Sequence, residues 1–292
     1  MKGSPLLELV RSLRLRQWVK NGVLFAPLVF AQKGTVESSL VRALAGFGLF
    51  GLLASGVYLF NDVLDRERDR LHPEKRHRPI AAGTLAVPLA LGVSFALAAT
   101  SVGLSFWLAR PFGWAAAAYL GLQVGYSVWL KHLVLVDVFA LAAGFLLRVI
   151  AGGLVIGVPL SNWLYLCTLL LALFLACAKR RAEIVALGDD AAGHRRSLAH
   201  YSVPLLDQLI GILAATTILA YALYTLSPET QAKFGTDALK LTVPFVIFGL
   251  FRYLYLIHQH GKGGSPDKVL MQDVPLLLDV CLFLGVVLAV LY

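Results

Sequence analysis

Long apolar runs recur along the whole of this 292-residue chain, and short polar clusters separate them. A helix that crosses a bilayer needs about 20 consecutive apolar residues, which is the length of these runs. Hydrophobic residues make up 58% of the sequence and charged residues 15%, against about 45–50% and about 25% in soluble domains. The pattern therefore predicts an all-α, polytopic integral membrane protein and excludes a soluble core of amphipathic helices.

About nine transmembrane helices are predicted, packed as a bundle around a central cavity and forming a single domain over residues 1–292. An amphipathic segment at 4–17 precedes them and is expected to lie in the membrane interface. The first span is short and contains Pro27, a residue that disfavours the interior of a helix. The predicted spans are 20–34, 38–60, 84–108, 112–130, 134–157, 161–178, 205–226, 239–259 and 273–291.

Lysine and arginine residues decide the orientation of a membrane protein, because they are retained on the cytoplasmic side. With the N-terminus inside, 19 of the 26 basic residues fall in cytoplasmic segments and 5 in outside segments. All of the long polar loops then face the cytoplasm from the cell (inner or plasma) membrane, and we expect the active-site loops there. This bias explains the net charge of +9, so no nucleic-acid partner is expected. Homo-oligomerisation is left open.

The polar cluster after the second span carries three aspartates and an asparagine at helical spacing: Asn61, Asp62, Asp65 and Asp69. If the helix continues at about 100° per residue, all four lie within an arc of about 100°, and Glu67 points away. Carboxylates on one face repel each other and require a counter-charge. Oxygen ligands suit Mg²⁺, which commonly joins one or two carboxylates to substrate phosphates. The sequence therefore predicts a magnesium site at these four residues.

A basic tract, with Lys75, Arg76 and Arg78, follows the aspartates directly. Acidic and then basic residues within one loop suit a metal–diphosphate complex, because lysine and arginine can bind the phosphate oxygens that the metal leaves open. The positive-inside bias alone would explain the basic residues but not the acidic ones before them.

The pattern NDxxDxxxD at Asn61–Asp69, placed after the second helix, resembles the UbiA superfamily of intramembrane prenyltransferases. The longer string from Asn61 to Gly83 resembles one branch of it, the decaprenyl-phosphate phosphoribosyltransferases. Other segments that resemble this branch are Arg16-Gln17-Trp18-Val19-Lys20-Asn21; Tyr126, Leu130-Lys131-His132 and Asp137; Leu147-Arg148 with Ala151-Gly152-Gly153; and Lys179-Arg180, Glu183, Arg196-Ser197-Leu198 and Tyr201.

The resemblance implies Mg²⁺-dependent transfer of a 5-phosphoribosyl group from 5-phosphoribosyl-1-diphosphate to a polyprenyl phosphate lipid. Diphosphate is released, and the product would feed arabinan synthesis for the cell wall. Asp62, Asp65 and Asp69 are the expected catalytic residues and, with Asn61, the metal ligands. The expected substrate-binding residues are Lys20, Asn21, Asn61, Lys75, Arg76, Arg78, Tyr126, Lys131, Asp137, Arg148, Lys179, Arg180, Glu183, Arg196 and Tyr201.

The second cytoplasmic loop separates this branch from the aromatic prenyltransferases, which usually carry a second aspartate-rich motif there. This chain has Lys179, Arg180, Arg181 and Glu183 instead. Three bases and one acid favour a ligand with an additional phosphate, and a structural ion pair is the alternative. Arg148 lies within the fifth span, where a charge is costly; both a substrate contact and a protein partner such as Asp137 are open for it.

Two other functions fit the same loops. An aromatic or tetrapyrrole prenyltransferase would use the aspartates to activate a prenyl diphosphate. A transporter or lipid-binding membrane protein would bind a phosphorylated compound without chemistry. Release of diphosphate separates the enzymes from the third class, and the identity of the donor separates the two enzymes.

Overall fold

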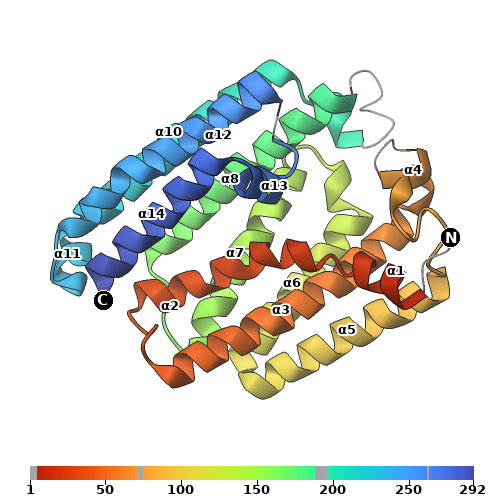
Figure 1. Ribbon diagram of the computed structural model, residues 1–292, viewed down its shortest axis with the longest axis horizontal. Helices are drawn as coiled ribbons and strands as arrows, with labels where there is room; N and C mark the ends of the chain where they lie inside the picture. The colour runs from red at the N-terminus through yellow and green to blue at the C-terminus, as the bar shows by residue number, and fades with distance from the viewer. Residues whose placement is uncertain (1–4, 72–74, 188–195, 262) are drawn as a thin grey trace. The chain divides into compact units, whose positions relative to one another are not determined.

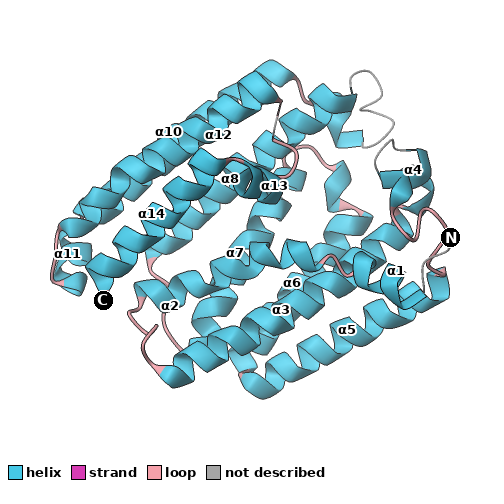
Figure 2. Ribbon diagram, viewed as in Figure 1, coloured by secondary structure: helices cyan, strands magenta, loops and turns pink. Residues whose placement is uncertain are grey.

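A computed structural model describes residues 5–71, 75–187, 196–261 and 263–292 of the chain (Figure 1). The regular secondary structure of these ranges is entirely helical (Figure 2), as the apolar pattern predicts. Residues 72–74 of the string from Asn61 to Gly83 lie outside the described residues, as does the side chain of Arg196.

Within the described residues, seven helical spans are long and apolar enough to cross a membrane, which confirms seven of the predicted nine. They are α3 (Glu37–Leu64), α5 (Val87–Leu108), α7 (Val136–Ile156), α8 (Asn162–Leu187), α10 (Val203–Leu226), η6 with α12 (Ala238–Thr242 and Val243–His260) and α14 (Val274–Leu291). The other two spans stay predictions. The range 112–130 falls on α6 (Arg110–Val128), and the range 20–34 falls mainly on η1 (Leu15–Phe25) and α2 (Ala26–Phe30).

The segment expected to form the first span differs from the continuous α-helix that was predicted. It begins as the 3₁₀ helix η1 and becomes α-helical only at Ala26. Two glycines let η1 approach its neighbours closely. A Cβ atom on Gly152 of α7 would lie 2.1 Å from the Leu24 carbonyl oxygen, and one on Gly51 of α3 would lie 2.5 Å from the Trp18 ring. The close fit explains why glycine occupies both positions.

The remaining helical elements are short and cap or connect the long ones. α1 falls within the amphipathic segment predicted at 4–17 and contacts α3. These elements are α1 (Pro5–Ser12), α4 (Arg66–Leu71), η2 (Lys75–His77), η3 (Leu130–His132), η5 (Arg196–His200), α11 (Pro228–Phe234) and α13 (Pro266–Gln272).

The chain forms two compact units. The single domain and the central cavity that the sequence suggests stay predictions. In the first unit, α3, α5 and α6 pack together around Phe50, Phe112 and Tyr119. In the second, α8 packs on α10, and α10, α12 and α14 lie side by side (Figure 1). The first unit holds the described residues up to Leu28, Gly34–Lys131 and Leu147–Pro159; the second holds Val29–Lys33, His132–Leu146 and the described residues from Leu160 onward.

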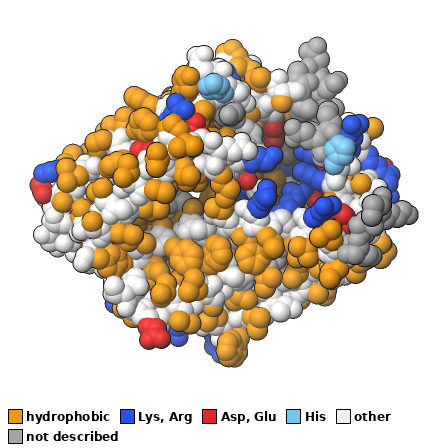
Figure 3. Space-filling model, viewed as in Figure 1, with side chains coloured by type: hydrophobic (Ala, Val, Ile, Leu, Met, Phe, Trp, Pro, Cys, Tyr) orange, Lys and Arg blue, Asp and Glu red, His pale blue; other side chains and the backbone are white. Residues whose placement is uncertain are grey.

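Large apolar side chains cover the outer surface of the first unit. Only 17% of the span in α5 is buried inside the protein, and Phe95 and Trp107 on this helix are 76% and 85% exposed. Figure 3 shows hydrophobic side chains over α3 and α5, whereas lysine and arginine side chains gather beside α4. A continuous apolar surface of this kind is suited to lipid rather than to water.

Candidate active site

The aspartates at the end of α3 and in α4 share one face because helical hydrogen bonding continues through the junction of the two helices. The Asp65 amide donates to the Asn61 carbonyl at 2.9 Å, and the Asp69 amide donates to the Asp65 carbonyl at 2.8 Å. Glu67 lies off this face: its side chain is 73% exposed and pairs with Arg70 at 2.9 Å. The sequence spacing therefore predicted the local geometry correctly.

Each of the three aspartates is held by a cation of the same unit. Arg78 Nη1 donates to Asp62 Oδ1 at 3.0 Å and to Asp69 Oδ2 at 2.7 Å. Arg14 Nη2 donates to Asp62 Oδ2 at 2.6 Å, and Lys131 Nζ donates to Asp65 Oδ1 at 2.7 Å. We call these six residues the aspartate cluster.

Burial separates the roles that the three carboxylates can take. The side chains of Asp62 and Asp69 are 3% and 6% exposed, whereas that of Asp65 is 21% exposed. Burial raises the pKa of Asp69; the Arg78 guanidinium opposes this shift and the Asp62 carboxylate adds to it. Asp65 is therefore the carboxylate that a ligand reaches most easily.

The aspartate cluster fits a hard divalent cation. A single nitrogen, Arg78 Nη1, contacts oxygens of both Asp62 and Asp69, so it stands in for one cation between two carboxylates. No group of three or more His, Cys, Asp or Glu in the described ranges could hold a metal by itself. Two carboxylates suit Mg²⁺ nonetheless, because Mg²⁺ usually keeps waters and takes substrate phosphates as its remaining ligands.

Arg14 is the site residue that the sequence did not indicate. It falls in the amphipathic segment predicted at 4–17, and it lies 48 residues before Asp62. Its backbone adopts the left-handed conformation, with φ of 52°, and its guanidinium lies 5.2 Å from the ring centre of Tyr58. No local pattern could have paired Arg14 with Asp62, because the packing of η1 against α3 makes the contact.

Arg148 is buried in the first unit and bonded to protein groups. Its Nε donates to Asn21 Oδ1 and its Nη2 to the Tyr119 hydroxyl, both at 2.7 Å. The guanidinium also lies 4.6 Å from the Tyr119 ring centre. The nitrogen of the Asn21 side-chain amide, Nδ2, is buried and has no hydrogen-bond partner among the described atoms. Arg148 thus orients an amide whose donor is available to a ligand oxygen.

A second acid–base group, which we call the second-loop cluster, lies within the second unit. Asp137 and Arg180 are fully buried and form an ion pair, with Arg180 Nε 2.7 Å from Asp137 Oδ2. The N–H bond of Nε does not point at this oxygen, so the contact is an ion pair and not a hydrogen bond. Arg180 also pairs with Glu183. The Tyr201 hydroxyl donates to Asp137 Oδ1 and accepts from the Leu135 amide, both at 2.7 Å. Ser197 Oγ lies 3.4 Å from Asp137 Oδ2 and completes the cluster.

The second-loop cluster joins a strained turn at Leu135 to the loop that carries Tyr201. Leu135 has φ of 64°, a conformation that branched residues rarely adopt, and its amide is held by Tyr201. Burial raises the pKa of Tyr201, and the hydrogen bond to Asp137 raises it further. The described contacts of Arg180 are those of the structural ion pair named as the alternative for this loop, and a phosphate contact by Arg180 stays a prediction.

Five further residues that the sequence predicts to bind substrate do not belong to either cluster. Arg76 is exposed, with Nε 3.4 Å from the His77 ring. The other four are half-buried: Lys20, Lys75, Tyr126 and Lys179. Their substrate contacts stay predictions.

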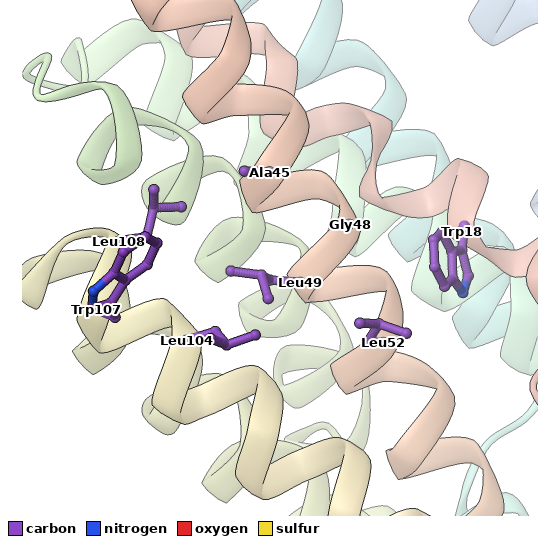
Figure 4. Close-up of a pocket in the computed structure, with 8 residues that line it drawn as sticks. All are labelled: Trp18, Ala45, Gly48, Leu49, Leu52, Leu104, Trp107 and Leu108. Carbon is purple, nitrogen blue, oxygen red and sulfur yellow. The ribbon is translucent and has the colours of Figure 1, made fainter.

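An apolar groove of about 390 Å³ lies along the middle of α3, beside α5. Figure 4 shows Leu49 and Leu104 between the two helices, with Trp18 beyond α3. Leu52 at one end of the groove precedes Asp62 by ten residues, which is about 15 Å along the helix. The lining residues are Trp18, Ala45, Gly48, Leu49, Leu52, Leu104, Trp107 and Leu108.

Comparison with known proteins identifies the family to which this chain belongs. Residues 22–271 match the UbiA prenyltransferase family, and the chain belongs to this family. With its apolar spans it is therefore a multi-pass membrane protein.

Two curated relatives are decaprenyl-phosphate phosphoribosyltransferases. The protein from Corynebacterium glutamicum is 36% identical over 91% of this chain and 81% of its own length. The one from Mycolicibacterium smegmatis is 33% identical over 97% of this chain and 92% of its own length. A solved UbiA homologue from Archaeoglobus fulgidus, bound to GPP and Mg²⁺, has the same fold, with a TM-score of 0.72 at 20% identity, covering 97% of this chain and 99% of that one.

Proposed function

We propose that this protein transfers the 5-phosphoribosyl group from 5-phosphoribosyl-1-diphosphate to a decaprenyl-type polyprenyl phosphate, releasing diphosphate. The product would serve as a precursor of cell-wall arabinan. The observation that carries the proposal is the convergence of Asp62 and Asp69 on one cation position beside Arg14 and Lys131. The identity of 33–36% to named phosphoribosyltransferases over most of the chain supports this choice of donor and acceptor.

The aspartate cluster would bind the donor by exchanging partners. Asn61, Asp62, Asp65 and Asp69 would hold Mg²⁺, which would neutralise the charge that develops on the departing diphosphate. Arg14, Arg78 and Lys131 already lie beside these carboxylates. Once the carboxylates bind the metal, these three side chains can turn their donors to phosphate oxygens, for which arginine is geometrically matched.

The acceptor needs little activation by the protein. A lipid phosphate is already an anion, so its oxygen can form the new bond to the anomeric carbon as the bond from that carbon to diphosphate breaks. No general base is required. The apolar groove along α3 would hold part of the prenyl chain, because its end at Leu52 lies about 15 Å from Asp62 along the same helix.

The other predicted contacts belong to the same proposal. Asn21 would donate its unpartnered Nδ2 to a ligand oxygen, oriented by Arg148. Asp137, Glu183 and Tyr201 would act mainly by positioning the second loop. Lys20, Lys75, Arg76, Tyr126, Lys179, Arg180 and Arg196 would bind the phosphates and ribose of the donor. The excess of basic residues in these loops supports a cytoplasmic position for them and for the N-terminus.

The test is release of diphosphate by purified protein in detergent with Mg²⁺. We expect release only when 5-phosphoribosyl-1-diphosphate and polyprenyl phosphate are both present, together with a phosphoribosylated lipid. Turnover of a prenyl diphosphate with an aromatic acceptor instead would assign the protein to the aromatic prenyltransferases. Absence of release from either donor, with binding retained, would favour a transporter or lipid-binding protein.

A further inference from the structure

A second groove, independent of the proposed active site, lies between α12 and α14 in the second unit. Its volume is about 390 Å³, within the range of about 300–1,000 Å³ typical of small-molecule sites. One ionisable side chain lines it among apolar ones. The lining residues are Pro244, Phe245, Phe248, Pro275, Leu278, Asp279 and Leu282.

Asp279 is the feature that distinguishes this groove from an ordinary gap filled by lipid. The residue is only 8% exposed, and no hydrogen bond or ion pair joins its side chain to another described residue. The facing helix makes room for it: a Cβ atom on Gly249 would lie 2.9 Å from Asp279 Oδ2. Asp273, which caps the start of α14, does have a partner: it accepts two hydrogen bonds from Arg252 of α12, at 3.0 and 2.9 Å.

Asp279 lies within a predicted membrane span on its own helix, five residues from the start of the span Val274–Leu291, or about 8 Å along the helix. Gly249, which faces it, is the central residue of the span Ala238–His260, about 16 Å along the helix from either end. An ionised or unbonded polar group at that depth is costly, and an intramembrane acid without a partner indicates a functional site. A ligand that carries its own polar group into the hydrocarbon region would satisfy this carboxyl.

We propose that the groove between α12 and α14 binds a neutral lipid alcohol, a long hydrocarbon chain that ends in a hydroxyl group, with the hydroxyl bonded to Asp279. A hydroxyl both donates and accepts, so it can pair with either the protonated or the ionised carboxyl. A phosphate would bring like charge to the acid, and an amine would bring a charge into the hydrocarbon region. The apolar lining accommodates the chain.

The test compares a radiolabelled C20 prenol with the C20 hydrocarbon that has the same chain but no hydroxyl group. Binding is measured on the purified full-length protein in detergent. We expect the prenol to bind about tenfold more tightly than the hydrocarbon, as one hydrogen bond in an apolar site would give. In Asp279→Leu the two probes should bind equally, and in Asp279→Asn, which keeps a donor and an acceptor, most of the preference should remain.

Equal binding of the prenol and the hydrocarbon to the unaltered protein would overturn the proposal, as would a preference that survives in Asp279→Leu. Gly249→Ala is a second variant in case Asp279→Leu does not fold. Its methyl group displaces the carboxyl and should weaken the preference for the prenol without removing the acid. Melting temperatures measured without probe show which variants are folded.

Discussion

The two acid–base clusters use the same kinds of side chain and differ mainly in access. In the aspartate cluster, each ion pair has one partly exposed member, because Asp65, Arg14 and Arg78 are 21%, 25% and 26% exposed whereas their partners are 3–6% exposed. In the second-loop cluster, Asp137 and Arg180 are both 0% exposed. Partly exposed ion pairs contribute little to stability and are easily opened, whereas separating a buried pair is strongly unfavourable. The first cluster is thus suited to exchange partners with a ligand, and the second to hold a loop in place.

The largest expected effect comes from opening the buried cluster. Arg180→Met leaves Asp137 buried without its cation, so we expect the free energy of unfolding to fall by about 3–5 kcal/mol. Chemical unfolding in detergent measures this change. Arg181→Met is the matched control, because the partner of Arg181, Asp207, is 33% exposed, and a loss of about 1 kcal/mol or less is expected. Equal losses in the two variants would remove the distinction between the clusters.

In the aspartate cluster, loss of a charged side chain should affect turnover and not folding. Asp65→Asn removes the most exposed carboxylate of the proposed metal site, and we expect diphosphate release to fall on the order of 100-fold. The melting temperature should change little. Glu67→Gln makes the same chemical change two residues away, at a side chain 73% exposed, and should retain normal release. Normal release by Asp65→Asn would contradict the proposed metal site.

A smaller loss is expected from Tyr201→Phe, which leaves the Leu135 amide and one Asp137 oxygen without the hydroxyl. The predicted decrease in unfolding free energy is about 1–3 kcal/mol. Because the folded state raises the pKa of Tyr201, this stabilisation should be constant below the unfolded pKa of about 10 and decline as the pH rises above it. Unfolding at pH 7 and pH 9 should therefore give the same difference, and Tyr165→Phe, at a side chain 44% exposed, should show none.

The smallest effect is expected from loosening the packing of η1, the helix that follows Arg14 of the aspartate cluster directly. Gly51→Ala forces the Trp18 ring to move, and we expect a net loss of about 1 kcal/mol after the gain in helix propensity. Gly48→Ala, one turn earlier, meets nothing within 4 Å and should be neutral or slightly stabilising. Thermal unfolding of the two variants distinguishes the effects, and identical melting temperatures would show that the Trp18 contact has no energetic role.

Those features of the protein that depend on local chemistry could be predicted from the sequence. Membrane spans follow from the length of apolar runs, because each helix satisfies its own backbone hydrogen bonds in lipid. The common face of Asn61, Asp65 and Asp69 follows from helical periodicity alone. The irregular first segment was less predictable, since its 3₁₀ geometry accompanies close contacts at Gly51 and Gly152.

The tertiary structure alone decided which charge meets which. Arg14 reaches Asp62 across 48 residues. Asp137 meets Arg180 from a different helix, whereas the sequence left open a phosphate or an ion pair for that arginine, and a substrate or a partner such as Asp137 for Arg148. Gly249 similarly brings an acid that no motif marks into a groove between two helices. Periodicity describes the direction of a side chain on its own helix, but a partner from a remote segment is set by how the helices pack, and packing depends on the whole chain.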